Sequence, residues 1–178
     1  IMTISNIKNP PLVALTLEEL LQRKIPKRNN LLSPWLPSQG LCMLYSTRGL
    51  GKTWMALGIA HAVASNDSFL SWETGSAEGV LYIDGEMPMA VMQERLAQIV
   101  TSSSKEISAP FSIITPDAQE FGIPDLSKTD GQERINKLIS DETKLIVMDN
   151  LSSLTRTGKE NEGESWLPVQ EWALRLRS

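Results

Sequence analysis

The stretch Ser46-Thr47-Arg48-Gly49-Leu50-Gly51-Lys52-Thr53 is followed directly by Trp54 and an alanine-rich run. An apolar run at residues 41–45 precedes it, so the order strand, glycine-bearing loop, helix is predicted. In that context the pattern indicates a P-loop, because glycines let backbone N–H groups point at phosphate oxygens beside a helix N-terminus. We expect residues 46–54 to bind a nucleotide, with Lys52 at the β- and γ-phosphates and the Thr53 hydroxyl on Mg²⁺.

One position departs from the consensus G-x-x-x-x-G-K-[ST], because its first glycine is replaced by Ser46. Serine cannot adopt every backbone conformation that is open to glycine. The alternative interpretation is an ordinary glycine-containing turn between a strand and a helix, with no phosphate bound. The intact Gly51-Lys52-Thr53 in its strand–loop–helix context favours the phosphate site.

Composition limits the class of protein. The chain has 178 residues, 41% hydrophobic and 21% charged, which is typical of one globular domain. The formal net charge of −4 argues against broad nucleic-acid wrapping, since such surfaces are usually basic, but it allows a small local contact. We find no signal-peptide pattern, and no run near the roughly 18 apolar residues of a membrane span. The single cysteine, Cys42, is predicted to pack as a small hydrophobe, and the lack of a disulfide pair suggests a cytoplasmic protein.

Helix and strand patterns alternate along the chain. Further strands are predicted at residues 80–84, 111–115 and 145–149, and helices at residues 54–64, 88–100, 129–139 and 165–177. This alternation predicts an α/β domain with a mainly parallel sheet, whose ligand site lies at the carboxyl ends of the strands. Residues 1–31 are expected to form an N-terminal arm with a short helix, which begins at the capping-box pair Thr16 and Glu19. Residues 32–178 then form the nucleotide-binding domain. The single histidine, His61, has no sequence partner for metal or triad chemistry and is predicted to be structural.

Two acidic residues follow predicted strands. Asp149 ends an apolar strand, which is typical of a Walker B carboxylate that holds Mg²⁺, directly or through water, opposite Thr53. Glu86 follows residues 80–84 and is our candidate for the base that polarises the attacking water. The alternatives are a buried strand that simply ends in aspartate, and a solvated or helix-dipole-favoured glutamate. Hydrolysis needs a water-activating group and the sequence offers no better one, which favours the catalytic interpretation.

Three segments together resemble RecA-fold ATPases: Lys52-Thr53, residues 80–88 (VLYIDGEMP) and residues 145–154 (LIVMDNLSSL). The resemblance is to the AAA_25 group in particular, which includes the RepA-type hexameric replicative helicases of plasmids, and it spans residues 32–178. It implies a P-loop NTPase fold, a three-layer αβα sandwich, with Glu86 as catalytic base and Asp149 as the Mg²⁺-linked acid. It also implies ATP hydrolysis, a homo-oligomer that forms a hexameric ring, and helicase-like action on DNA in replication or recombination.

The same resemblance implies elements for which this chain has no segment. In such proteins a strand with a γ-phosphate sensor lies between the P-loop strand and the Walker B strand, and further strands and an arginine finger follow. We therefore interpret the chain as an N-terminal part of a longer ATPase, with its C-terminal strands missing. Two central strands are expected to lack ladder partners unless strands rearrange or another chain fills the gap. Nucleotide binding and turnover by this chain alone are expected to be weak, because each unpaired buried backbone group costs about 1–3 kcal/mol.

Two other classes of function remain open. A small-molecule kinase also uses a P-loop and Mg²⁺-binding acids, although no arginine-rich lid segment follows the strands. A nucleotide-binding interaction module without turnover is the other.

The loop at residues 155–163 carries Arg156 and Lys159 beside Glu160 and Glu162. In RecA-type proteins the corresponding loop faces single-stranded DNA, so this loop is either a weak DNA contact or a solvated loop of mixed charge.

Overall fold

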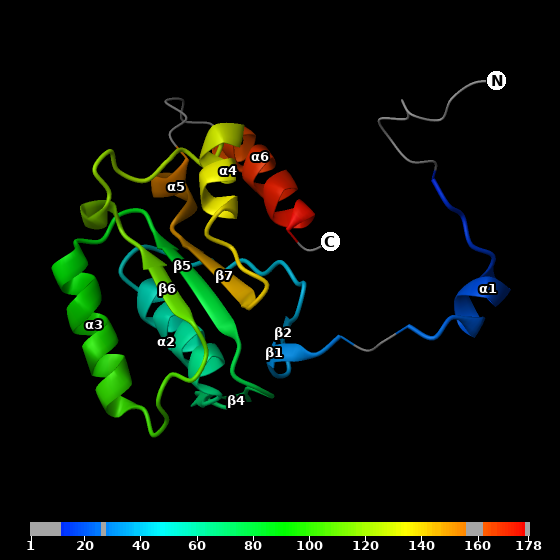
Figure 1. Ribbon diagram of the computed structural model, residues 1–178, viewed down its shortest axis with the longest axis horizontal. Coiled ribbons are helices and arrows are strands. Elements are labelled where there is room, and N and C mark those ends of the chain that lie inside the picture. The colour runs from blue at the N-terminus through cyan, green and yellow to red at the C-terminus, as the bar shows by residue number, and fades with distance from the viewer. Residues whose placement is uncertain (1–11, 26–27, 156–161, 177–178) are drawn as a thin grey trace.

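The computed structural model describes residues 12–25, 28–155 and 162–176. The main sheet of this described part has three parallel strands in the order β6-β5-β7 (Figure 1). They are β5 (Gly79–Asp84), β6 (Phe111–Ile114) and β7 (Thr143–Asp149). In the register, Tyr82 of β5 lies opposite Ile113 on one side and Val147 on the other. The predicted α/β class with a parallel sheet is confirmed, although three strands do not amount to the full expected sandwich.

Helices pack on both faces of this sheet. They are α2 (Lys52–Ser65), α3 (Met89–Ser102), α4 (Thr129–Asn136), α5 (Leu151–Leu154) and α6 (Glu162–Arg175). Since side chains alternate between the faces of a strand, β5 supplies two separate cores. Val80 and Tyr82 pack with α2 and α3, whereas Leu81 and Ile83 pack with residues of α4, α5 and α6. The apolar residues of β5 are thus buried on both faces, as is usual for a parallel strand.

The remaining elements are small: α1 (Leu17–Gln22), β1 (Asn30–Leu32), β2 (Leu36–Pro37), β3 (Ser68–Phe69), β4 (Trp72–Glu73) and the 3-10 turn η1 (Pro116–Ala118). Strands β1 and β2 form one antiparallel hairpin, and β3 and β4 form another. The capping box that starts α1 is confirmed, since the Glu19 N–H donates to Thr16 Oγ1 at 3.2 Å and the Thr16 N–H to Glu19 Oε2 at 2.7 Å. Figure 1 shows α1 away from the body, on the side opposite α3.

Residues 41–45 do not form the predicted strand. The segment is irregular, and Met43, Leu44 and Tyr45 are 61%, 48% and 89% exposed. Cys42 is exposed too, so the prediction that it packs as a small hydrophobe is wrong. The physical reason is that a strand needs a neighbour for its backbone groups and cover for its side chains. Among the described strands none pairs with this segment, and β7 pairs with β5 alone.

No helix within the described residues is both long enough and apolar enough to span a bilayer.

Candidate nucleotide site

Two glycines of the loop at residues 46–53 have a left-handed backbone conformation. Gly49 and Gly51 both have φ of 84°, in the left-handed region that favours glycine. A Cβ added at either residue would meet nothing within 4 Å, so both face open space. Ser46, in contrast, is not among the residues with positive φ. The serine at the first consensus position therefore needs none of the conformational freedom of glycine in this loop.

The side chain of Lys52 closes the loop. Its ammonium group donates hydrogen bonds to the carbonyl oxygens of Ser46 and Thr47, both at 2.9 Å. Lys52 is the first residue of α2, and Gly51 before it provides no side-chain cap. The first N–H groups of a helix have no acceptor within the helix, so they remain available to an anion. A lysine ammonium, uncapped N–H groups and open space at two glycines together fit a polyphosphate.

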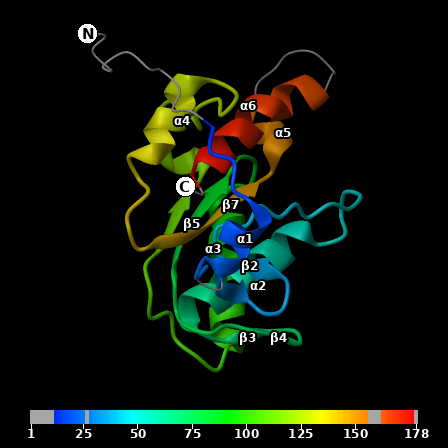
Figure 2. The ribbon, with the colours of Figure 1, turned by 90° about the vertical axis from the view of Figure 1, so that its right-hand side faces the viewer.

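The position of α2 brings this loop to the edge of the sheet at which the parallel strands end. Figures 1 and 2 show the chain entering α2 at the edge where the three parallel strands end. Helix α2 packs against both β5 and β7. Val147 faces the core that contains α2, and Asp149, two residues later, lies on the same face because strand side chains repeat with period 2. Asp149 and Thr53 of α2 therefore lie on the same face of the sheet.

Asp149 is held by a tyrosine from the neighbouring strand. The Tyr82 hydroxyl donates to Asp149 Oδ2 at 2.8 Å, and the Gly85 N–H donates to the Asp149 carbonyl oxygen at 2.8 Å. Burial raises the pKa of Tyr82 well above its usual range, and the Asp149 carboxylate adds to this shift. Tyr82 thus remains a protonated donor that fixes the orientation of the carboxylate. Sequence reasoning missed this contact, because Tyr82 lies within an apolar run and reads as a core residue.

Glu86 lies in the turn that follows β5. The Asn150 side-chain amide donates to Glu86 Oε2 at 2.7 Å. The backbone N–H groups of Glu86 and Met87 donate to the carboxylate of Asp84, which is 2% exposed. Burial raises the pKa of Asp84, and these backbone hydrogen bonds oppose the rise. The structure therefore joins Glu86 to the end of β7 through Asn150, and Asp84 fixes the backbone of the turn.

Two other predicted nucleotide contacts, Leu50 and Trp54, lie at the surface. Leu50 is 72% exposed, and Trp54 lies under Arg95, whose guanidinium carbon is 5.4 Å from the centre of the indole ring.

The described residues form no complete metal site by themselves. Among them, no hydrogen bond links the loop to Glu86 or Asp149, and no three His, Cys, Asp or Glu residues cluster as metal ligands. A Mg²⁺ ion held by Thr53 and Asp149 would therefore take its other oxygen ligands from phosphate and water.

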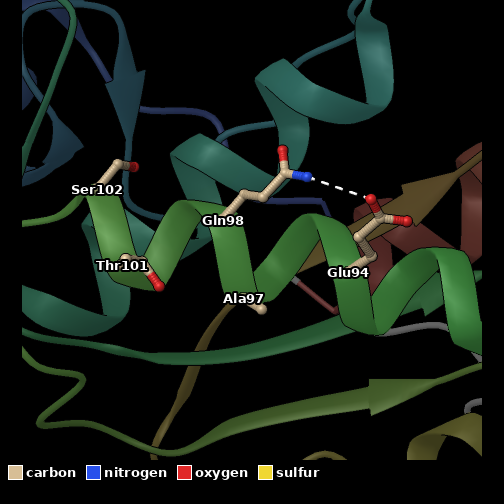
Figure 3. A pocket seen from close by; sticks show the side chains of 5 residues that line it. All are labelled: Glu94, Ala97, Gln98, Thr101 and Ser102. Atoms are coloured by element: carbon tan, nitrogen blue, oxygen red, sulfur yellow. Dashed lines mark hydrogen bonds between the residues drawn. The ribbon is translucent and has the colours of Figure 1, made fainter.

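Two hollows on the surface differ in their relation to this site. The hollow in Figure 3 is lined by five residues of α3 alone: Glu94, Ala97, Gln98, Thr101 and Ser102. It contains none of the candidate residues. A second groove is lined by Leu50, Gly51 and Trp54 together with residues of α3 and of the β3–β4 hairpin, so it adjoins the loop. The buried His61 also lines this groove, and burial lowers its pKa, which favours a neutral imidazole.

Comparison with protein families gives one result that covers nearly the whole chain. The AAA_25 family, described as an AAA domain, matches residues 8–177. The matched range includes the loop at residues 46–54, Glu86 and Asp149. A search of curated proteins gave no match.

Proposed function

Since the chain belongs to the AAA_25 family of AAA domains, we propose that it binds ATP with Mg²⁺ at residues 46–54 and hydrolyses it. Membership of an AAA family supports a nucleotide-binding, ATPase-like function in general. The observation that carries the specific proposal is the loop geometry at the start of α2, in which two left-handed glycines face open space and the Lys52 ammonium lies against the loop carbonyl oxygens. The carboxylates at the ends of β5 and β7 complete the set of groups that hydrolysis needs.

Each residue has a distinct role in this proposal. Lys52 exchanges the carbonyl oxygens of Ser46 and Thr47 for phosphate oxygens. Thr53 and Asp149 hold the metal ion, which supplies positive charge against the phosphates when it is bound. Glu86 takes the proton of the attacking water, a contribution that is typically about 10²–10⁴-fold.

Binding is tested first with Lys52→Ala. We expect nucleotide binding to be lost, because the phosphate charge loses its main partner, while the far-ultraviolet circular dichroism stays unchanged. Titration calorimetry with Mg-ATP and Mg-ADP measures the affinity. Lys144→Ala is the matched control, since Lys144 is an exposed lysine at the opposite end of β7. An unchanged affinity in Lys52→Ala would remove the loop as the site.

Hydrolysis is tested separately with Glu86→Gln. This variant should bind Mg-ATP normally and release phosphate about 10²–10⁴-fold more slowly. Glu94→Gln, on the exposed surface of α3, is the control for a lost carboxylate. Normal phosphate release by Glu86→Gln would exclude it from the mechanism. If neither the original chain nor any variant releases phosphate, the second candidate function is favoured, an interaction module without turnover. The exposure of the apolar residues 41–45 supports this candidate, since exposed apolar residues are available to a partner.

We further propose that the protein works as a homo-oligomer, a hexameric ring that acts on DNA in replication or recombination in a helicase-like way. The resemblance to RepA-type helicases motivates the ring. The exposed Leu17, Leu20 and Leu21 of α1 support self-association, because a helix this short gains stability chiefly by packing. Leu20→Asp should weaken self-association in sedimentation experiments, and Leu12→Asp, outside α1, should not.

The contact with single-stranded DNA is proposed for the loop at residues 155–163. Arg156 and Lys159, the basic residues of this loop, lie outside the described residues. Replacing both by alanine should lower DNA affinity. It should also make the dependence of log K on log[salt] less steep, by the amount that about two lost phosphate contacts would give. An unchanged affinity and slope would leave the loop as a solvated segment of mixed charge.

A further inference from the structure

The side chain of Asn150 forms hydrogen bonds in two directions. Its Oδ1 accepts from the Ser153 N–H at 3.0 Å and from the Ser152 hydroxyl, and its Nδ2 donates to Glu86 Oε2 at 2.7 Å. A backbone N–H can only donate, and an ionised carboxylate can only accept. These two partners therefore fix the orientation of the amide, so the donor is directed at Glu86.

The packing of α5 holds Asn150 in place. Asn150 is the N-cap residue of α5, and Leu154 of the same helix is 1% exposed in the core. A Cβ added at Gly85 would come within 2.3 Å of Ser153 Oγ and 2.8 Å of Leu154 Cδ2. Helix α5 is thus packed directly against the turn that carries Glu86, with no room for a side chain between them.

From this geometry we propose that Asn150 is a positioning residue for Glu86. Glu86 is exposed, so without a fixed donor its carboxylate would rotate among many side-chain conformers. The Asn150 amide holds Oε2 and leaves Oε1 to accept the proton of water. Because Asn150 directly follows Asp149, the last residue of β7, it connects Glu86 to the strand that carries the proposed metal-side carboxylate. The inference rests on the proposed catalytic role of Glu86.

The alternative role for Asn150 is purely structural, as the cap of α5. Asn150→Ser separates the two roles, because serine retains an N-cap acceptor but has no amide to donate to Glu86. Positioning predicts a loss in kcat of about 10²-fold, with KM, nucleotide affinity and the unfolding midpoint unchanged. Asn150→Asp, which also keeps the cap acceptor, should lose more, since its carboxylate repels Glu86. A structural role predicts no change in kcat for either variant.

A spectroscopic readout tests the contact without turnover. The side-chain NH₂ resonances of Asn150 in the nucleotide-free protein should shift in Glu86→Gln, because a charged acceptor is lost, and should stay in place in Glu94→Gln. Unshifted resonances in Glu86→Gln would overturn the inference. This measurement needs no substituted Asn150, so it remains decisive if the Asn150 variants fold poorly.

The two proposals fail in different ways. Normal hydrolysis by Glu86→Gln would remove the proposed catalytic base. A slow Glu86→Gln together with an Asn150→Ser that is as fast as the original chain, or faster, would overturn the positioning role alone. In the double variant, Asn150→Ser should add no further loss to Glu86→Gln, because Asn150 acts through Glu86.

Discussion

Residues 80–83 and residues 41–45 are both short apolar runs that precede a glycine-containing turn and a helix, yet their environments are opposite. Val80, Leu81, Tyr82 and Ile83 are at most 3% exposed, whereas Tyr45 is 89% exposed. Strand β5 has a paired strand on each side and helices over both faces. Residues 41–45 pair with none of the described strands. The comparison teaches that an apolar run becomes a strand only where its backbone finds partners and its side chains find cover.

The largest expected difference is between alanine substitutions in the two runs. Ile83→Ala should cost about 2–5 kcal/mol of unfolding free energy, because it leaves a cavity at a fully buried position. Leu44→Ala should change it by less than about 0.5 kcal/mol. Urea unfolding followed by circular dichroism measures both. A large loss for Leu44→Ala would mean that residues 41–45 are covered in solution.

The glycines that follow the two runs provide the next test. Gly85→Ala should destabilise by about 1–3 kcal/mol, since the new methyl group overlaps Ser153 and Leu154 of α5. It should also slow hydrolysis by displacing Glu86. Gly49→Ala has open space around it, so its cost of about 1–2 kcal/mol comes from the left-handed backbone alone. Its functional effect should appear in nucleotide affinity instead. Equal effects of the two variants on affinity would contradict this division.

Helix α2 follows residues 41–45 in the chain and packs against β5, and its buried His61 makes a pH-dependent contribution to the stability of the fold. Burial lowers the pKa of His61 below its usual value near 6.5, so the native state prefers the neutral ring. This preference contributes stability above the unfolded-state pKa, and the contribution is lost as the pH falls through the native pKa. His61→Leu should therefore lose less stability than the original chain between pH 7 and pH 5. Parallel pH profiles for the two proteins would show that His61 does not contribute.

The smallest expected effect concerns Cys42. Cys42→Ser should leave the unfolding free energy within about 0.5 kcal/mol, because the side chain is exposed. The native Cys42 thiol should react with a disulfide reagent about as fast as it does in urea. Protection of the thiol in a larger assembly, but not in this chain alone, would show that the run becomes covered there.

The sequence predicted the parts of the fold that depend on local pattern. The strands around residues 80–84, 111–115 and 145–149 are present, since each is an apolar run closed by polar or turn residues. The β3–β4 hairpin was not predicted, because strands of two residues are too short for an alternating pattern. The strand at residues 41–45 was predicted wrongly, because a local pattern cannot reveal whether a neighbouring strand is there.

The candidate site divides in the same way. The glycine-bearing loop was identified from consecutive residues, and its role as a phosphate site stays a prediction. The contacts that orient the two acids were not found, because Tyr82 is 67 positions from Asp149 and Asn150 is 64 positions from Glu86. A pattern search along one chain has no signal for pairs so far apart. Strand register brings them together, with Asp84 opposite Asp149.

If the loop at residues 46–53 binds a phosphate, as we propose, the two hydrogen bonds from the Lys52 ammonium to its own loop affect how tightly the nucleotide is held. They draw the two ends of the loop together before any ligand arrives, so less conformational entropy is lost when a phosphate is bound. The same carbonyl oxygens of Ser46 and Thr47 then compete with the phosphate for one ammonium group. The affinity of the proposed site would therefore reflect the difference between two sets of contacts to Lys52. A weakly bound nucleotide would be compatible with a fully formed loop.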